Sequence, residues 1–339
     1  MDYTLPLRLY TSRKVAQPSI RGVLLMSITV ASNVGVLFIH LLSGHIKWKI
    51  GALLSVTVLI PVSIYILYLP ESPIFLMKTG SNEDARRVFF QLRGISDISK
   101  KEFEKITEKE RELNKSQGLS FVALMYSLSN PIFWKPLLIV FAAMFTVQLT
   151  GYSAMISYAI EELQDFGLNY EYSAMITIDI FRVAATMFSC ILVQKMTRRR
   201  LAMLSGYGSS VTLFCLWFYL YISPRYNVKL PLVVMVLLII NICFIHMGLN
   251  PLAYALMGEL FPMDNKSMGA AISSIFCYTL YYLVVLSYPY LRVLFSGIAE
   301  IFLGYSACVL FGTICLTLFL PETKDKPFYM IEEYFKSRK

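Results

Sequence analysis

WKIGALLSVTVLIPVSIYILYLPESP, residues 48–73, is a long apolar run that stops abruptly at two prolines and a glutamate. The part from Gly51 to Leu69 carries no charge. A helix of ~20 such residues, rising 1.5 Å per residue, crosses the ~30 Å hydrocarbon core of a bilayer. Pro70 and Pro73 end a helix because proline lacks an N–H and restricts the residue before it. The stretch therefore predicts a transmembrane helix that ends in water at Glu71.

The composition supports a membrane protein. Hydrophobic residues make up 56% of the chain and charged residues 16%, whereas soluble domains have ~45–50% and ~25%. Because seven more runs are long enough to span a bilayer, the sequence predicts an all-α membrane protein with about eight transmembrane helices. The eight predicted spans are residues 22–43, 48–69, 136–160, 174–192, 201–222, 230–258, 269–290 and 297–320.

Lysine and arginine predict how these spans are oriented. If the N-terminus is cytoplasmic, 25 of the 31 Lys and Arg residues fall on the cytoplasmic side, five fall in the opposite loops, and Arg182 lies within a span. Positive residues collect on the cytoplasmic side of membrane proteins. We therefore expect a multi-pass protein with both termini in the cytoplasm. The net charge of +9 reflects these membrane flanks, and no nucleic-acid partner is expected.

Two parts of the chain echo each other. LYLPES at residues 67–72 and LFLPET at residues 318–323 both close an apolar run, and PSIRG at residues 18–22 weakly matches MDNKSMGA at residues 263–270. Related halves repeated along a chain are typical of transporters. Six predicted spans separate the two LPE motifs, but only two precede the first. If the halves match, four spans are missing from the front.

A polar block separates the second span from the third. SNEDARRVFFQLRG begins at Ser81 with a cap-like residue and acidic residues, and Phe103, Ile106 and Leu113 form a thin apolar stripe. The block predicts short amphipathic helices at the membrane surface. The domains we predict are a cytoplasmic segment (1–21), two spans (22–70), a cytoplasmic linker (71–135), a six-helix bundle (136–320) and a cytoplasmic tail (321–339).

Six ordered motifs carry a family resemblance. They are PSIRG (18–22), PESPIFL (70–76), QLTGYSAMISY (148–158), MTRRRLA (196–202), NPLAYALMGELFP (250–262) and PETKDKP (321–327). From Tyr10 to Glu333 the chain resembles the sugar porters of the major facilitator superfamily, especially animal facilitative glucose transporters and the insect trehalose transporter-like branch. Members of that family have twelve spans in two six-helix bundles. The resemblance implies a major facilitator-type bundle that corresponds to spans five to twelve.

The resemblance implies a set of gating residues. In the family, charges at the cytoplasmic ends form salt bridges when the cavity faces outward and lose them when it faces inward, and a tyrosine belongs to the outer gate. Charges at such positions are also expected simply because they mark membrane ends. The matching residues here are Arg21, Glu71, Arg198, Arg199, Glu259 and Glu322 for the salt bridges and Tyr158 for the outer gate.

The family's solute site is matched less well. Sugars are bound by amide side chains, which donate and accept hydrogen bonds, and by aromatic faces. Several family amides are replaced here, for example by Val147 and Ser153, so a hexose bound as in the glucose transporters is not expected. The positions that match the family's solute site are Thr29, Gln148, Ser153, Tyr254, Cys277 and Tyr278.

Arg182 lies where the family has a neutral polar residue facing the cavity. A charge inside a membrane costs ~2.5 kcal/mol or more. Asp179 lies three residues earlier, on the same helical face, so an internal ion pair is one interpretation. The other is that Arg182 helps to bind an anionic or differently hydroxylated solute. Both interpretations stay open at this point.

The expected function is transport of a sugar, such as a hexose or a trehalose-like solute, or a related polyol, by alternating access. The plasma membrane is the expected location, and the lipid bilayer and a small solute are the expected partners. A truncated, transport-incompetent member with a structural or partner role is the alternative, and self-pairing or a partner chain would follow if the truncation is real. No enzyme activity and no cofactor are expected. His40, His45 and His246 stand alone and predict no metal site.

Overall fold

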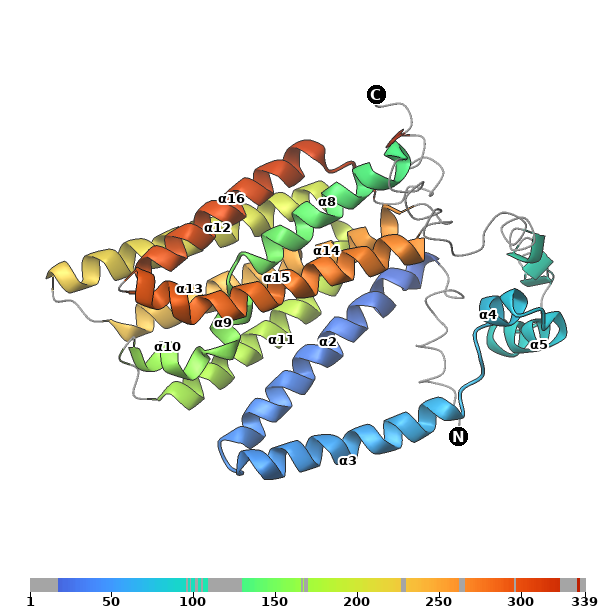
Figure 1. The fold of residues 1–339 in the computed structure, drawn as a ribbon, viewed down its shortest axis with the longest axis horizontal. Helices are drawn as coiled ribbons and strands as arrows, with labels where there is room; N and C mark the ends of the chain where they lie inside the picture. The colour runs from blue at the N-terminus through green and yellow to red at the C-terminus, as the bar shows by residue number, and fades with distance from the viewer. Residues whose placement is uncertain are drawn as a thin grey trace. The chain divides into compact units, whose positions relative to one another are not determined.

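The structure, a computed structural model, has helices as its regular elements in the part of the chain that it describes (Figure 1). It describes residues 18–95, 97, 99–100, 103–104, 106–108, 130–165, 167, 170–226, 230–261, 266–295, 297–323 and 334–335. The chain divides into two compact units, one of residues 1–25 and 45–128 and the other of residues 26–44 and 129–339.

Seven helical segments in the described ranges are long and apolar enough to cross a membrane. The remaining predicted span corresponds to helix α2 (Pro18–Ser43), in which the stretch Thr29–Ser43 is a shorter apolar helix. The predicted all-α membrane fold is therefore confirmed. The seven segments are Trp48–Leu67, Pro131–Ser157, Glu171–Lys195, Arg198–Tyr226, Pro231–Glu259, Met268–Leu294 and Ala299–Phe319.

The first unit contains α3 (Trp48–Leu67), α4 (Pro73–Lys78) and α5 (Asn82–Arg93). Helix α3 has no buried residue, as expected for a helix surrounded by lipid. It ends three residues before Pro70, in agreement with the predicted stop. Helix α5 follows Ser81 and has two acids in its first turn, where the helix dipole favours negative charge. The predicted amphipathic helix at this position is confirmed.

A small aromatic cluster covers the apolar side of α5. The rings of Phe89 and Phe103 lie 5.2 Å apart, and those of Phe90 and Phe103 lie 5.7 Å apart. Phe89 is buried. Phe103 thus packs on α5, as the predicted apolar stripe requires. Leu113, the last member of that stripe, lies outside the described residues.

The second unit is a helix bundle. Helix α12 packs between α16 and α13, and α8 packs between α15 and α16 (Figure 1). A Cβ on Gly206 would lie 2.2 Å from Thr313, and one on Gly312 would lie 2.1 Å from Thr146, so small residues allow these close approaches. The helices are α8 (Pro131–Gln148), α11 (Glu171–Lys195), α12 (Arg198–Tyr226), α13 (Pro231–Phe244), α15 (Lys266–Leu294) and α16 (Ala299–Phe319).

Helix α8 begins earlier than predicted. Its first residue is Pro131, whereas the apolar run suggested residue 136. Asn130 caps the helix, because its side chain accepts a hydrogen bond of 3.1 Å from the backbone N–H of Ile132. Pro131 then occupies the first helical position, where its missing N–H costs nothing. The cap therefore places a full extra turn before the apolar run.

Residues 26–44 of α2 belong to the second unit and lie along α11. The side-chain amide of Asn33 donates a 2.8 Å hydrogen bond to the hydroxyl of Thr186. Farther along, the hydroxyl of Tyr172 donates a 2.7 Å bond to the carbonyl of Leu41. These bonds fix α2 against α11 with polar contacts, which is how helices associate where lipid removes the hydrophobic driving force.

Candidate functional site

The helix that starts at Pro131 is broken in its second half. Helix α8 ends at Gln148, and α9 (Tyr152–Ser157) and α10 (Ala159–Asp165) follow after a change of direction at Gly151. Gly151 has φ of 72°, which favours glycine, and a Cβ there would lie 2.2 Å from the ring of Tyr305. The break leaves backbone groups near Gln148 and Ser153 outside regular helix. Discontinuous helices are where transporters form their solute sites.

A second irregularity lies in the span that starts at Pro231. The chain passes from α13 through a π-helical segment, η1 (Ile245–Leu249), into α14 (Asn250–Glu259). Pro251 follows immediately and cannot donate a backbone hydrogen bond. The π-helical segment includes His246, which is buried. Such π segments are frequent at functional sites because they rotate side chains away from the regular helical face.

Several polar atoms beside these two breaks are buried without a partner. The described part of the chain offers no hydrogen bond to Gln148 Oε1, Ser153 Oγ, Arg182 Nε, Arg182 Nη2 or either ring nitrogen of His246. An unpaired buried polar group costs ~1–3 kcal/mol. A protein retains several of them together mainly where a ligand or water supplies the missing bonds. These atoms therefore mark a candidate solute site within the second unit.

Aromatic residues surround these polar groups. The rings of Tyr152 and His246 meet edge to face at 5.7 Å. The amide nitrogen of Gln148 donates to the sulfur of Cys277 at 3.2 Å, and Tyr254 lies beside the same cysteine. The candidate site thus joins residues from α8, α9, η1, α14 and α15. Tyr152 was missed by the sequence, because the family pattern has no aromatic residue there to compare.

The predicted solute-site residues differ in how far they are buried. Gln148, Ser153 and Cys277 are buried, and Gln148 contacts Cys277 as described. Tyr254 is 37% exposed and Tyr278 is 67% exposed. Thr29 is half-buried on α2. The roles of Thr29, Tyr254 and Tyr278 in a solute site therefore stay predictions.

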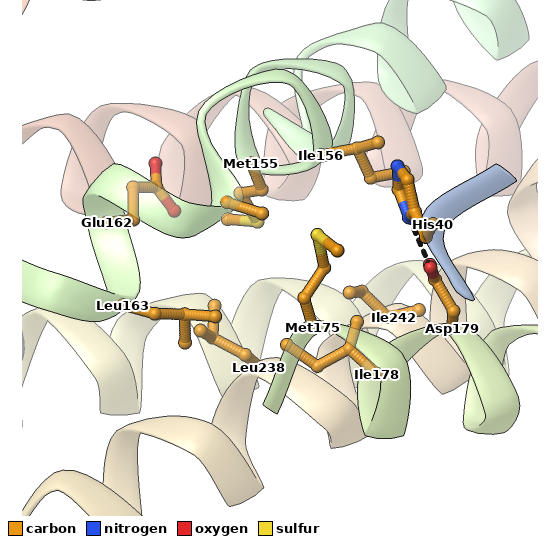
Figure 2. A pocket seen from close by; sticks show the side chains of 11 residues that line it. His40, Met155, Ile156, Glu162, Leu163, Met175, Ile178, Asp179, Leu238 and Ile242 are labelled. Carbon is orange, nitrogen blue, oxygen red and sulfur yellow. Dashed lines mark hydrogen bonds and ion pairs between the residues drawn. The ribbon is translucent and has the colours of Figure 1, made fainter. Parts of the chain in front are cut away.

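The predicted pair of Asp179 and Arg182 is confirmed. Arg182 Nη2 lies 2.8 Å from Asp179 Oδ1, and both side chains are about 2–3% exposed. The contact is an ion pair without a hydrogen bond, because the N–H groups of Arg182 Nη2 do not point at the carboxylate oxygen. The sequence did not predict a partner for His40, and its Nδ1 contacts the other carboxylate oxygen, Asp179 Oδ2 (Figure 2). Sequence spacing could not show this contact between two helices.

A cavity lies next to this group. It measures about 20 Å³, which is room for about one water molecule. Figure 2 shows His40 and Asp179 at one end, Glu162 at the other, and Met155 and Met175 between them. The walls are otherwise apolar. Carboxylates therefore occur at both ends of a narrow apolar space.

Arg198 is the centre of an ion-pair cluster at the end of the bundle where α11 meets α12. Its guanidinium donates to both carboxylate oxygens of Glu259, at 2.8 and 3.2 Å. Its backbone N–H donates to Glu322 Oε1 at 3.1 Å, and the hydroxyl of Thr323 donates to Glu259 at 2.7 Å. The sequence motifs at residues 198, 259 and 322 are thus brought together as the resemblance implied. We call these four residues the Arg198 cluster.

The other predicted gating charges are Arg199, Glu71 and Arg21. Arg199 is exposed on the first turn of α12. Glu71 is exposed in the first unit. Arg21 lies in α2, and its side chain is outside the described residues. Their participation in a gate stays a prediction.

The opposite end of the bundle has its own contacts, made by Tyr158 and α10 with α15. The ring of Tyr158 stacks on Tyr288 at 5.3 Å, and the hydroxyl of Tyr288 donates to Glu162. Asp165 pairs with Arg292. Glu162 lies beyond the end of its span at Ser157.

The carboxyl of Glu162 is electrostatically unusual. Burial raises its pKa from 4.5 to about 7, against the Tyr288 hydrogen bond and the positive charge of Arg292, which lower the pKa. Glu162 therefore holds a proton more readily than an ordinary glutamate. The sequence gave no reason to separate Glu162 from its neighbour Glu161, because only Glu162 turns toward α15.

Comparisons with known proteins place these features in context. The sequence model described as Sugar (and other) transporter matches residues 9–335. The facilitated trehalose transporter Tret1 of Drosophila willistoni is 26% identical over 99% of this chain and 38% of its own length. Its counterpart in Polypedilum vanderplanki is also 26% identical, over 99% of this chain and 66% of its own length. The chain thus spans less than two thirds of these relatives.

Solved structures show the same fold. The proton:xylose symporter XylE bound to 6-bromo-6-deoxy-D-glucose superposes with a TM-score of 0.72 at 20% identity, over 96% of this chain and 70% of that one. The inward open XylE from E. coli has a TM-score of 0.66 at 19% identity, over 96% and 68% of the two chains. This likeness establishes a major facilitator-type bundle. Because the family's sequence model covers almost the whole length, the chain belongs to the Sugar (and other) transporter family.

Proposed function

We propose that this chain serves the movement of a sugar or related polyol across a membrane by alternating access. The observation that carries the proposal is the group of unpartnered polar atoms on Gln148, Ser153, Arg182 and His246, buried inside an apolar bundle beside two broken helices. A polyhydroxylated solute can donate and accept bonds to all of them. The names of the relatives suggest trehalose and xylose as the first solutes to test.

The residues have distinct proposed roles. Gln148 presents its carbonyl oxygen to a solute hydroxyl while its amide nitrogen is held by Cys277. Tyr152 and Tyr254 offer aromatic faces to the apolar side of a sugar ring. Thr29 and Tyr278 approach the solute from α2 and α15. Each of these side chains supplies either hydrogen bonds or stacking.

The two ends of the bundle have proposed gating roles. The Arg198 cluster would hold its end of the bundle together in one state and separate in the other. Glu71, Arg199 and Arg21 would add charges on the same, cytoplasmic, side. Tyr158, stacked on Tyr288, would close the opposite, outer, side. A switch of this kind needs contacts that exist in only one of the two states.

The proposed setting is the plasma membrane, with both termini in the cytoplasm. Lipid would contact the apolar surface of α3, which has no buried residue. The distribution of Lys and Arg supports this orientation. Pairing with a second copy or with another chain stays a prediction.

The test is uptake by liposomes that contain the purified full chain, with radiolabelled trehalose, xylose and glucose as probes. Replacing Gln148→Leu removes the buried amide, and we expect at least about a tenfold loss of uptake, since one lost hydrogen bond is worth ~1.4 kcal/mol. Gln164→Leu, an exposed glutamine on α10, is the matched control. If folded protein takes up none of the three sugars, or if the two variants behave alike, the proposal is wrong.

A further inference from the structure

The charges around Asp179 do not match a site built for a neutral solute alone. One carboxylate is shared by the guanidinium of Arg182, at 2.8 Å, and by the imidazole of His40. Asp179 and Arg182 are almost completely buried. A single buried carboxylate thus balances one permanent positive charge and contacts one group that can become positive.

Arg182 has a donor to spare. Its Nε makes no hydrogen bond within the described part of the chain, whereas its Nη2 lies 2.8 Å from Asp179 Oδ1. The planar guanidinium matches the two oxygens of a carboxylate better than any other side chain does. Tyr152 and His246, which belong to the candidate solute site, lie within electrostatic range of Arg182. The unused Nε donor is therefore available beside the polar atoms that would hold a solute.

Charge balance predicts that a proton binds when a carboxylate binds. Asp179 already neutralises Arg182, so a carboxylate entering the site would leave one uncompensated negative charge in the bundle. Such a buried charge is expensive. One proton on His40 removes the imbalance, because the group then holds two positive and two negative charges. Anion binding and proton binding at this site would therefore favour each other.

The surroundings of His40 contain few competing charges. Helix α11 supplies Asp179 and Arg182, and α10 supplies Glu162 at the far end of the shared cavity (Figure 2). The hydroxyl of Tyr172 donates to the backbone carbonyl of His40 and does not engage the ring. The lining residues of α13 are apolar. Within the described part of the chain, Asp179 is thus the nearest acid to the imidazole.

We propose that the site takes a sugar acid, a solute with several hydroxyl groups and one carboxylate, together with one proton. The carboxylate pairs with Arg182, the hydroxyl groups bond Gln148 and Ser153, and the proton resides on His40. The inference rests on the proposed function, because it assigns the same buried site to the solute. It narrows the solute class from sugars in general to their monocarboxylates.

The test is isothermal titration calorimetry on the full chain in lipid nanodiscs, with D-glucuronate and its neutral counterpart D-glucose as probes. Both are titrated at about pH 5.5 and at about pH 7.5. We expect glucuronate to bind at least about tenfold more tightly than glucose at the lower pH. Its affinity should fall as the pH rises, by up to about tenfold per pH unit for one coupled proton.

Three variants separate the parts of the proposal. Arg182→Gln should abolish the preference for glucuronate. His40→Gln keeps a hydrogen-bond donor for Asp179 and should remove most of the pH dependence of glucuronate affinity. This variant tests the proton even if Arg182→Gln does not fold. His45→Gln replaces an exposed histidine and should behave as the unmodified chain.

Each other outcome has a definite meaning. Glucose binding without a preference for glucuronate overturns the sugar-acid inference and leaves sugar transport standing. If glucuronate binding does not vary with pH, or varies equally in His40→Gln, the inference that a proton binds at His40 together with the anion is wrong. If neither compound binds a folded chain, the proposed solute site itself is wrong.

Discussion

Arg198 and Glu259 are joined by two hydrogen bonds, of 2.8 and 3.2 Å, although 61 residues separate them in the chain. The pair connects the start of α12 with the end of α14, and Glu322 and Thr323 add bonds from the residues after α16. Three segments far apart in the sequence thus meet at Arg198 and Glu259. The stability of this end of the bundle should therefore respond to small changes at Arg198.

The first prediction concerns this pair. Arg198→Lys keeps the charge, but lysine lacks the planar guanidinium whose two nitrogens bond the two oxygens of Glu259 in parallel. We expect the Arg198→Lys and Glu259→Gln variants to show a coupling energy of about 1–3 kcal/mol in a double-mutant cycle. The measurement is unfolding in mixed detergent micelles. Arg199→Lys, on the exposed neighbour, should cost almost nothing, and a coupling close to zero at Arg198 would contradict a structural pair.

The second prediction concerns the buried pair of Asp179 and Arg182. Asp179→Asn alone leaves a buried guanidinium without its counter-charge, which costs about 3–5 kcal/mol. The double variant Asp179→Asn with Arg182→Gln removes both charges and should be more stable than the single variant. Thermal unfolding of the three proteins in detergent measures the difference. Equal melting temperatures for the single and double variants would show that the two charges do not depend on each other.

The spans and the Asp179–Arg182 pair could be predicted because they depend on local features. A run of apolar residues determines a transmembrane helix wherever it packs, and two residues three apart share a helical face. The run 48–69 accordingly became the helix Trp48–Leu67. The predicted start of α8 was wrong because a capping asparagine indicates a helix start less clearly in a sequence than an apolar run indicates a span.

Contacts between helices could not be predicted in the same way. His40 and Asp179 lie 139 residues apart, and Glu162 and Tyr288 lie 126 apart. Whether such residues meet depends on how each helix is rotated about its axis, and these nearly all-apolar helices have no polar face from which to read that rotation. The Arg198 cluster was predicted despite its long separations, because the family resemblance supplied the missing information.

The third prediction is a pH dependence that comes from Glu162. Its pKa is about 7 in the folded protein, whereas the ordinary value, which applies to the unfolded chain, is 4.5. Between pH 4.5 and about pH 7 the folded state therefore keeps a proton that the unfolded state has lost. Stability should therefore be greatest below pH 4.5, fall as the pH rises through this window, and reach its full loss above pH 7. The shift corresponds to roughly 3 kcal/mol.

Melting temperatures in detergent between about pH 5 and about pH 8 measure this slope. Glu162→Gln keeps a partner for the hydroxyl of Tyr288 but does not titrate, so it should remove most of the slope. Glu161→Gln is the matched control, because Glu161 is the exposed neighbour on the same helix. A slope that persists in Glu162→Gln would assign the effect to another group.

The last prediction concerns the helix break at Gly151. Gly151→Ala forces an L side chain into a φ of 72° and brings its Cβ within 2.2 Å of the Tyr305 ring. We expect a loss of at least about 2 kcal/mol in stability and a loss of sugar uptake, since Tyr305 must move and the break must reshape. Gly304→Ala is the control, because a Cβ there meets nothing within 4 Å and helical alanine is favoured by about 0.5–1 kcal/mol. If Gly151→Ala is as stable and as active as Gly304→Ala, the break does not need a glycine and its role in positioning Gln148 and Ser153 must be given up.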